Sequence, residues 1–261
     1  MKALAAAVAL ALTPAAALAG PRVASLDQCA DQYVLALAPP ETIAGVSPRA
    51  DDPDSRLRAA ARGAPRLRPT LEAVLMAEPQ VVVRYWGGDP RLMARLARQG
   101  VQVVQIEDAA DFDGVRANVR RVAAALDRTA AGEALVADLD ARLAAARQAP
   151  GRGPALYLTA GGFTAGAGTL IDAILNAAGY DNAAGPGFAP VSVERIALTP
   201  PARFVLGFFE LVRSDWRGPG RHPVVQRAAN RVPATWLRGE LLACPAWFAG
   251  EAVTRLSQAR P

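Results

Sequence analysis

The sequence predicts an α/β protein built from two Rossmann-like lobes with parallel sheets, joined by a single long α-helix. Three observations lead to this prediction. Short apolar, β-prone runs alternate with helical segments, which is typical of a parallel sheet covered by helices. An unusually long helical region, residues 112–148, divides this alternation into two parts. The chain has 261 residues, 52% of them hydrophobic, so it can bury the core of one large domain or of two lobes.

The first lobe is expected over residues 20–128. Its apolar runs predict strands, and the segments between them predict helices or loops. In order, these are a strand at 23–26, a helix at 29–37, a strand at 42–46, an arginine-rich loop around a short helix at 51–69, a helix at 71–77, a strand at 80–85, a helix at 90–99 and a strand at 101–106.

The middle of the chain is predicted to connect the lobes. Apolar residues recur at helical spacing through residues 112–148, and Thr129 and Gly132 interrupt the pattern, which predicts two helices. The second of them would form an inter-lobe helix over residues 129–150, ended by the run Pro150-Gly151-Arg152-Gly153-Pro154.

The second lobe is expected over residues 151–261, where the alternation resumes. Its predicted elements are a strand at 155–159, a tight glycine-rich turn at 161–168, a helix at 170–178, a helix at 193–198, a strand at 204–208, a helix at 223–229, a strand at 235–238 and a closing helix at 245–257.

One short unit occurs once in each half. Thr-Leu-Glu at 70–72 and Ser-Val-Glu at 192–194 are each followed, seven residues after the glutamate, by a proline and then by a buried strand. Helix capping explains the hydroxyl residues and suits an acid in the first turn. It does not explain why the unit occurs once per half. Two related lobes explain it.

The composition excludes several kinds of chemistry. The 29 basic residues include Lys2 as the single lysine, so 28 are arginine; with 24 acids the net charge is +5, and His222 is the single histidine. One histidine cannot build a His-rich metal site. We expect no metal site and no cofactor. Scattered arginines without interleaved aromatic residues do not favour nucleic acid as a partner.

The N-terminus reads as a targeting signal. Residues 1–19 combine a basic start, an apolar run and a final Ala-Leu-Ala, as secretory signal peptides do, so cleavage is expected before Gly20. The apolar run is too short to span a bilayer. The mature chain would then lack lysine, which excludes a P-loop lysine, a Schiff-base lysine and a Ser-x-x-Lys pair. The expected compartment is the periplasm, which is oxidising, so Cys29 and Cys244 either pair or remain as buried thiols; we favour the pair.

The order and spacing of several segments carry a resemblance that covers nearly the whole mature chain. They are the strand at 22–27 followed by Cys29-Ala30-Asp31-Gln32, the Leu71-Glu72 to Pro79–Val83 unit with its repeat, the long middle helix, and Gly166–Asp172 followed by Ala178–Asn182. In these features the sequence resembles class III periplasmic substrate-binding proteins, which deliver ferric siderophores, cobalamin or haem to an ABC importer.

The resemblance implies a binding protein without catalysis, with its ligand held in the cleft between the lobes. It also implies one exposed glutamate per lobe that docks on arginines of the membrane permease, and motif position gives this role to Glu72 and Glu194. Among metal chelates, we place a ferric siderophore first, cobalamin or another corrinoid second and haem third. Other classes stay open: a secreted α/β hydrolase, or an adaptor that has lost ligand binding. We expect a monomer.

Ligands of open α/β lobes bind beyond the carboxyl ends of the parallel strands. There, Tyr85 and Trp86 followed by Gly87 offer a flat apolar contact and a close approach to the backbone. Trp86 and Trp236 have an alternative role as core residues, and cleft arginines would suit an anionic ligand. The candidate ligand-binding residues are Gln28, Arg49, Arg68, Tyr85, Trp86, Gly87, Gly162, Phe163, Phe209 and Trp236.

Overall fold

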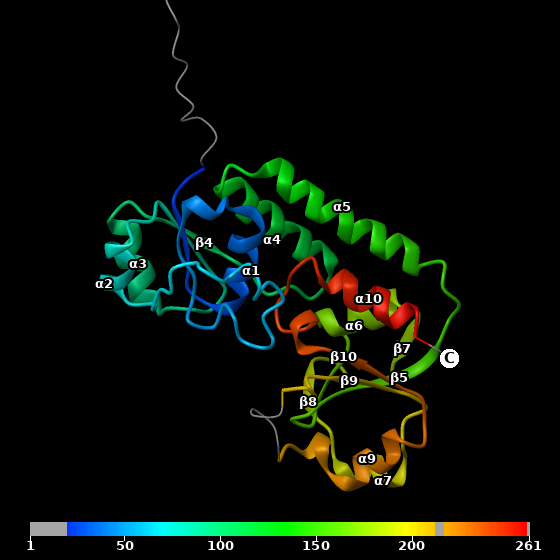
Figure 1. Cartoon of the computed structure of the whole chain (residues 1–261). Coiled ribbons are helices and arrows are strands. Elements are labelled where there is room, and N and C mark those ends of the chain that lie inside the picture. Colours follow the sequence, from blue (N-terminus) through cyan, green and yellow to red (C-terminus); the bar gives the residue numbers. More distant parts are fainter. Residues whose placement is uncertain (1–19, 212–216, 260–261) are drawn as a thin grey trace, which may run out of the picture.

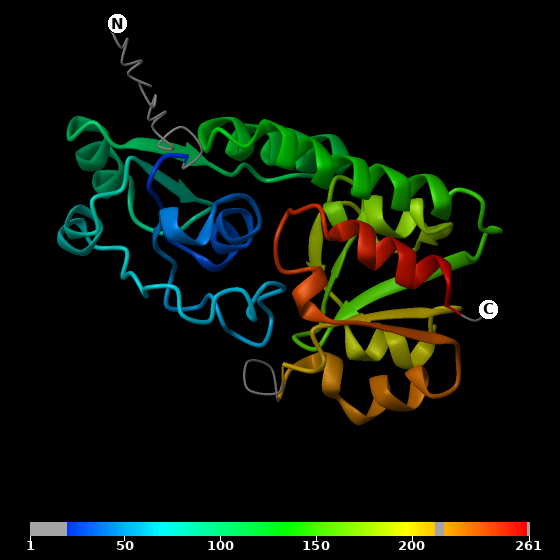
Figure 2. The same ribbon diagram turned by 45° about the horizontal axis from the view of Figure 1, so that its top comes forward.

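The computed structural model describes residues 20–211 and 217–259, so the expected signal peptide, residues 1–19, lies outside the described residues. It confirms the predicted fold class. Two four-stranded parallel sheets form two lobes, with a long helix running along both (Figures 1 and 2). The first sheet has the order β2-β1-β3-β4, and the second has the order β10-β9-β5-β7. The strands of the first sheet are β1 (Val23–Ser25), β2 (Ile43–Gly45), β3 (Val81–Arg84) and β4 (Gln102–Gln105). Those of the second are β5 (Gly153–Thr159), β7 (Tyr180–Asn182), β9 (Phe204–Gly207) and β10 (Ala234–Leu237).

The two sheets have the same topology. In chain order, β1, β2, β3 and β4 occupy the same places in their sheet as β5, β7, β9 and β10 occupy in theirs. The repeated sequence units therefore precede equivalent inner strands, β3 and β9. This equivalence supports the expectation that the two lobes are related.

The helices of the first lobe cover both faces of its sheet. Val81 and Val83 pack on the side of α1, and Val82 packs with Val74 and Leu96 on the other side, as the alternation of side chains along a strand requires. The helical elements are α1 (Gln28–Leu37), the 3₁₀ turn η2 (Pro40–Thr42), α2 (Leu71–Met76) and α3 (Pro90–Arg98). The short helix expected within residues 51–69 is absent from this segment, which is a series of turns. Pro53, Gly63 and Pro65 prevent a continuous helical hydrogen-bond ladder there.

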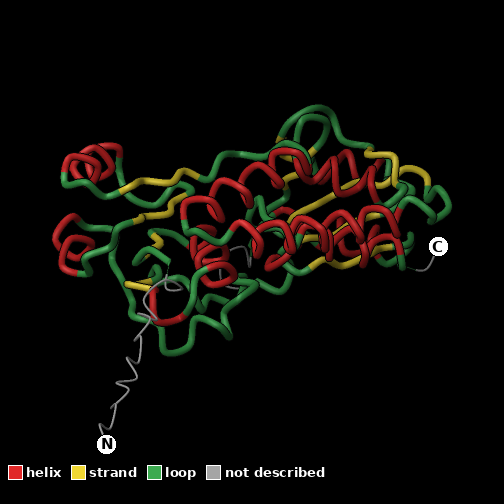
Figure 3. The backbone as a smooth tube through the Cα atoms, turned by 90° about the horizontal axis from the view of Figure 1, so that it is seen from above, coloured by secondary structure: helices red, strands yellow, loops and turns green. Residues whose placement is uncertain are grey.

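Two helices connect the lobes, α4 (Phe112–Ala125) and α5 (Thr129–Ala146). The break between them lies at Asp127, whose φ is 55°, and not at Gly132, which lies inside α5. Gly132 is where α5 crosses α4: a Cβ there would come within 2.4 Å of the Ala123 Cβ. α5 packs between α4 and α10 (Ala249–Ser257), and Figure 3 shows long helices side by side along the molecule.

The second lobe contains more short elements than predicted. Its remaining elements are α6 (Leu170–Ala177), α7 (Val193–Leu198), η3 (Pro219–Arg221), α9 (Pro223–Ala229) and η4 (Gly239–Leu241). The segment 161–168 is not simply a tight turn, because it contains β6 (Phe163–Ala165), which pairs antiparallel with β8 (Phe188–Pro190). The strands β6, β7 and β8 have three residues each, which is too short for a period of two to be recognised.

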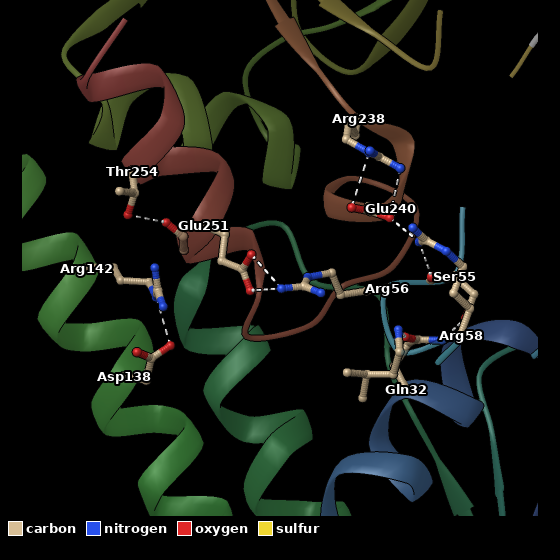
Figure 4. Close-up of polar contacts among 12 residues, drawn as sticks. Gln32, Ser55, Arg56, Arg58, Asp138, Arg142, Arg238, Glu240, Glu251 and Thr254 are labelled. Carbon is tan, nitrogen blue, oxygen red and sulfur yellow. Dashed lines mark hydrogen bonds and ion pairs between the residues drawn. The ribbon is translucent and has the colours of Figure 1, made fainter. Parts of the chain in front are cut away.

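The C-terminal segment, residues 239–251, forms a second connection between the lobes. Cys244 is bonded to Cys29 of α1, and the Tyr33 hydroxyl donates to the Pro245 carbonyl. Arg56 donates to both carboxylate oxygens of Glu251 at 3.0 Å, and Arg58 pairs with Glu240 (Figure 4). The inter-lobe helix is therefore not the sole contact between the lobes. The closing helix begins at Ala249 rather than at residue 245.

Candidate functional site

A cavity of about 1050 Å³ lies between the lobes, at the carboxyl ends of strands from both sheets. Such a volume is at the upper end for small-molecule sites. The first lobe contributes the loops after β1, β2, β3 and β4, and the second contributes β6, β8, the start of α6 and residues 241–245. The Cys29–Cys244 disulfide lies in the lining, so the covalent link between the lobes is also part of the cavity wall.

Asp27 organises the first-lobe wall. One carboxylate oxygen caps α1 by accepting from the backbone N–H groups of Cys29 and Ala30, at 3.1 and 3.0 Å. The other accepts from the N–H groups of Tyr85, Trp86 and Gly87, at 2.7, 3.2 and 2.9 Å. One side chain thus fixes the β3 loop against the start of α1. A Cβ on Gly87 would lie 2.3 Å from the Leu26 carbonyl oxygen, so this close approach requires glycine.

Asp31 is a buried acid beneath the same wall. Its carboxylate accepts from the hydroxyls of Ser25 and Ser47 and from the Ser47 N–H, at 2.8 Å for the last. Burial raises the pKa of Asp31 to about 6, against the lowering effect of these hydrogen bonds. Ser47 lines the cavity, so Asp31 holds one lining residue in position.

Tyr85 and Trp86 present aromatic surface to the cavity from the first lobe. Their ring centroids are 6.3 Å apart in an edge-to-face arrangement, and Trp86 is 66% exposed. The Tyr85 hydroxyl donates to Asp108, and burial together with this carboxylate raises the pKa of the phenol. Trp86 is therefore available for contact rather than being a core residue.

The second-lobe wall is aromatic as well. Phe163 and Phe188, from the β6–β8 pair, are exposed, and Tyr157 and Phe208 lie deeper in the lining. Phe208 has a φ of 65°, which interrupts the alternation of side chains after β9. As a result Phe208 faces the cavity, while Phe209 packs into the outer core of the lobe.

Six of the ten candidate ligand-binding residues line this cavity. They are Gln28, Arg49, Tyr85, Trp86, Gly87 and Phe163. The other four lie outside the lining. Arg68 is exposed, and Gly162, with φ 83°, turns the chain beside Pro219. Trp236 contacts Phe209 edge-to-face at 5.2 Å and is 46% exposed on the outer side of the edge strand β10.

Sequence reasoning missed Phe188, Phe208 and residues 241–245. Phe188 lies on one of the three-residue strands, and the place of Phe208 depends on a positive φ that Phe rarely adopts. Residues 241–245 reach the cavity by returning from the far end of the chain to α1. Their one sequence signal was Cys244, through its expected pairing with Cys29.

The described lining has few charges. It contains Asp27, Asp54 and Asp108 against Arg49, which gives a formal charge of −2. Arg49 itself is engaged by Asp52 at 2.8 Å, and this hydrogen bond raises the pKa of its guanidinium. The Gln28 Nε2 is buried in the lining without a hydrogen-bond partner. Among residues 20–211 and 217–259 no three His, Cys, Asp or Glu side chains are grouped to hold a bare metal ion.

The two candidate docking glutamates lie far from the cavity. Glu72 and Glu194 occupy the first turns of α2 and α7, after the capping residues Thr70 and Ser192, and both are exposed. Hydrogen bonds from its own backbone N–H and from the Ser192 hydroxyl lower the pKa of Glu194. Glu194 therefore presents negative charge to the solvent. No helix in the described part of the chain combines the length and apolar character needed to cross a membrane.

The comparisons with known proteins agree with this architecture. The profile of the family described as "Periplasmic binding protein" matches residues 23–205. The periplasmic heme-binding protein RhuT from Roseiflexus sp. RS-1 is 23% identical, with 91% of this chain and 97% of that chain covered and a TM-score of 0.66.

Two further structures show the same likeness. The heme-binding protein BhuT, in complex with two hemes, is 25% identical, with 91% and 98% covered and a TM-score of 0.66. The vitamin B12 binding protein BtuF of Vibrio cholerae is 17% identical, with 92% and 96% covered and a TM-score of 0.64. The curated proteins offer no match. Because the profile covers most of the chain, this protein belongs to the periplasmic binding protein family, the class III solute-binding components of ABC importers.

Proposed function

We propose that this chain captures a bulky, planar metal chelate of the tetrapyrrole kind in the inter-lobe cavity and delivers it to an ABC permease. One observation carries the proposal: the cavity of about 1050 Å³ is walled by aromatic side chains from both lobes. Flat macrocycles bury large apolar faces, and such contact favours aromatic walls. The likeness to heme-binding and vitamin B12 binding proteins supports the same class of ligand.

The charge of the lining favours a corrinoid over haem. Haem carries two propionates, whereas the rim of a corrinoid carries amides. The described lining has a formal charge of −2, and its one arginine is already paired with Asp52. Amides can donate to Asp54 and accept from the unpartnered Gln28 Nε2. Desolvating an unpaired propionate against these acids would cost binding free energy.

Haem is the second candidate, and Tyr85 favours it. A tyrosine oxygen is one of the known axial ligands of haem iron, and Tyr85 lines the cavity. A ferric siderophore, placed first from the sequence, moves behind both. The described lining lacks the several cations that an anionic ferric catecholate would need.

A titration of the purified mature chain tests the ligand. Cyanocobalamin, cobinamide, haemin, a ferric hydroxamate and a ferric catecholate are added separately, with calorimetry alongside tryptophan fluorescence. The corrinoids should bind most tightly and should quench Trp86. Trp236→Phe is the matched control, because Trp236 lies outside the cavity and its loss should leave the quenching intact. Trp86→Phe should remove most of it. The absence of saturable binding for every ligand would contradict the proposal.

We also propose that Glu72 and Glu194 dock on basic residues of the permease, as the family resemblance implies. Both are exposed, on helices in different lobes, and can steer and orient the chain electrostatically. Ligand uptake by vesicles containing the permease should fall when both are changed to alanine, while ligand binding in solution is unchanged. Glu78→Ala plus Glu107→Ala removes two other exposed glutamates and serves as the control.

The remaining parts of the proposal concern the mature protein. We infer export to the periplasm with cleavage before Gly20, and function as a monomer. Sequencing the N-terminus of the periplasmic protein tests the cleavage site. Light scattering of the purified chain tests the monomer, which a concentration-independent mass of two chains would refute.

A further inference from the structure

Each repeated unit carries a large apolar residue that the solvent reaches. Met76 and Leu198 are both 85% exposed, and each lies four residues after the glutamate of its unit. Residues four apart lie on the same side of a helix. Val74 and Ile196, midway between each glutamate and its apolar partner, are buried beneath the helices. Glutamate and apolar side chain therefore share the outward side of α2 and of α7.

The arrangement is duplicated at equivalent places in the fold. α2 leads into β3 and α7 leads into β9, and these strands hold the same position in their sheets. Figure 1 places α2 and α7 at opposite ends of the molecule, one in each lobe. A single exposed apolar side chain needs no explanation. Two of them, at equivalent positions and each one turn after a candidate docking acid, point to a shared use.

We propose that Glu72 with Met76, and Glu194 with Leu198, form two equivalent docking pairs, each fitting a cation beside an apolar recess on the permease. The inference rests on the proposed delivery to a permease. Each lobe of the chain presents a glutamate beside an apolar side chain. A two-fold symmetric dimer carries two copies of the same surface, so a permease of this kind could bind both pairs in the same way. The apolar half of each pair extends the docking role beyond the acids.

The two halves of each pair act on different rate constants. Exposed charges at the rim of an interface mainly raise the association rate, and their effect falls as salt is added. Buried apolar contacts have no such salt dependence and mainly slow dissociation. Kinetics therefore separates the new inference from the docking role of the acids.

The test measures binding of the ligand-loaded chain to its permease–ATPase complex in nanodiscs, at several salt concentrations. Met76→Ser with Leu198→Ser should weaken affinity about 10-fold, mainly through faster dissociation, with the salt dependence unchanged. Glu72→Gln with Glu194→Gln should lower the association rate and flatten the salt dependence. Met76→Leu with Leu198→Met keeps both apolar side chains and should stay within about twofold of the parent affinity.

The outcomes distinguish the two ideas. If the serine variant binds within about twofold of the parent while the glutamine variant is impaired, the apolar contacts are refuted and the acid docking stands. If the parent chain does not bind the permease at all, the proposed function fails and this inference with it. Ligand titration and circular dichroism of each variant verify folding. The ligand affinity and the circular dichroism spectrum should not change, because Met76 and Leu198 lie outside the core.

Discussion

Removing the Cys29–Cys244 disulfide should cost the protein several kcal/mol of stability. The cysteines are 215 residues apart in the sequence, so the bond closes nearly the whole described chain into one loop. The chain-entropy relation gives about 5 kcal/mol for a loop of this length, which is an upper value because real unfolded chains are compact. Both cysteines are buried, so alanine is the suitable replacement, and its own packing cost is small beside the loop term.

The assay is urea unfolding of the parent and of Cys29→Ala with Cys244→Ala, each with and without dithiothreitol. We expect the variant to lose about 2–5 kcal/mol, which moves the midpoint down by roughly 1–2 M urea for a chain of this size. Dithiothreitol should lower the parent to the level of the variant and leave the variant unchanged. Two alkylatable thiols in the untreated native parent, or a variant within about 1 kcal/mol of it, would refute the reasoning.

Three further predictions concern single residues. Because the folded chain raises the pKa of Asp31 from 3.8 to about 6, it binds that proton more tightly than the unfolded chain. About 3 kcal/mol of stability is therefore lost as pH rises from about 3 to 7; Asp31→Asn should abolish this loss in urea titrations, whereas equal pH slopes would contradict it. Gly132→Ala should destabilise the protein by about 1–3 kcal/mol despite the better helix propensity of alanine, because the new Cβ would clash with Ala123. Thermal melting measures this loss, and Gly151→Ala, with open space around it, is the control. Gln28→Met removes a buried amide whose Nε2 has no hydrogen-bond partner, so it should keep or raise the melting temperature and weaken ligand binding about 5-fold; unchanged affinity in calorimetry would exclude a ligand contact.

The sequence predicted the elements whose patterns are local. The long helices have apolar periodicities that extend over many residues, and the inner strands are short runs of buried apolar residues. The repeated glutamate units lie on equivalent helices, as related lobes require. The Tyr85-Trp86-Gly87 loop was found because parallel strands end at one edge of a sheet and glycine permits close backbone approach. The break between α4 and α5 was predicted, but its position depended on the positive φ of Asp127, which the pattern of apolar side chains does not indicate.

What the sequence did not predict depends on long-range geometry. Phe208 and Phe209 are adjacent and chemically identical, and a single positive φ decides which of them faces the cavity. Trp236 follows the normal alternation of β10, which takes it to the outer side beside Phe209. The role of residues 241–245 required knowing that the end of the chain returns to α1.

The return of residues 239–251 to the first lobe has a consequence for biosynthesis. The cavity wall at Cys29 is completed by a segment around Cys244 that lies 215 residues further along the chain, so it is synthesised after the strands of both sheets. The first lobe can form its sheet early, yet Cys29, Tyr33 and Arg56 stay without these partners until residues 244–251 have been synthesised. A chain cut short before Cys244 would therefore leave Cys29 without its disulfide partner and the cavity wall incomplete.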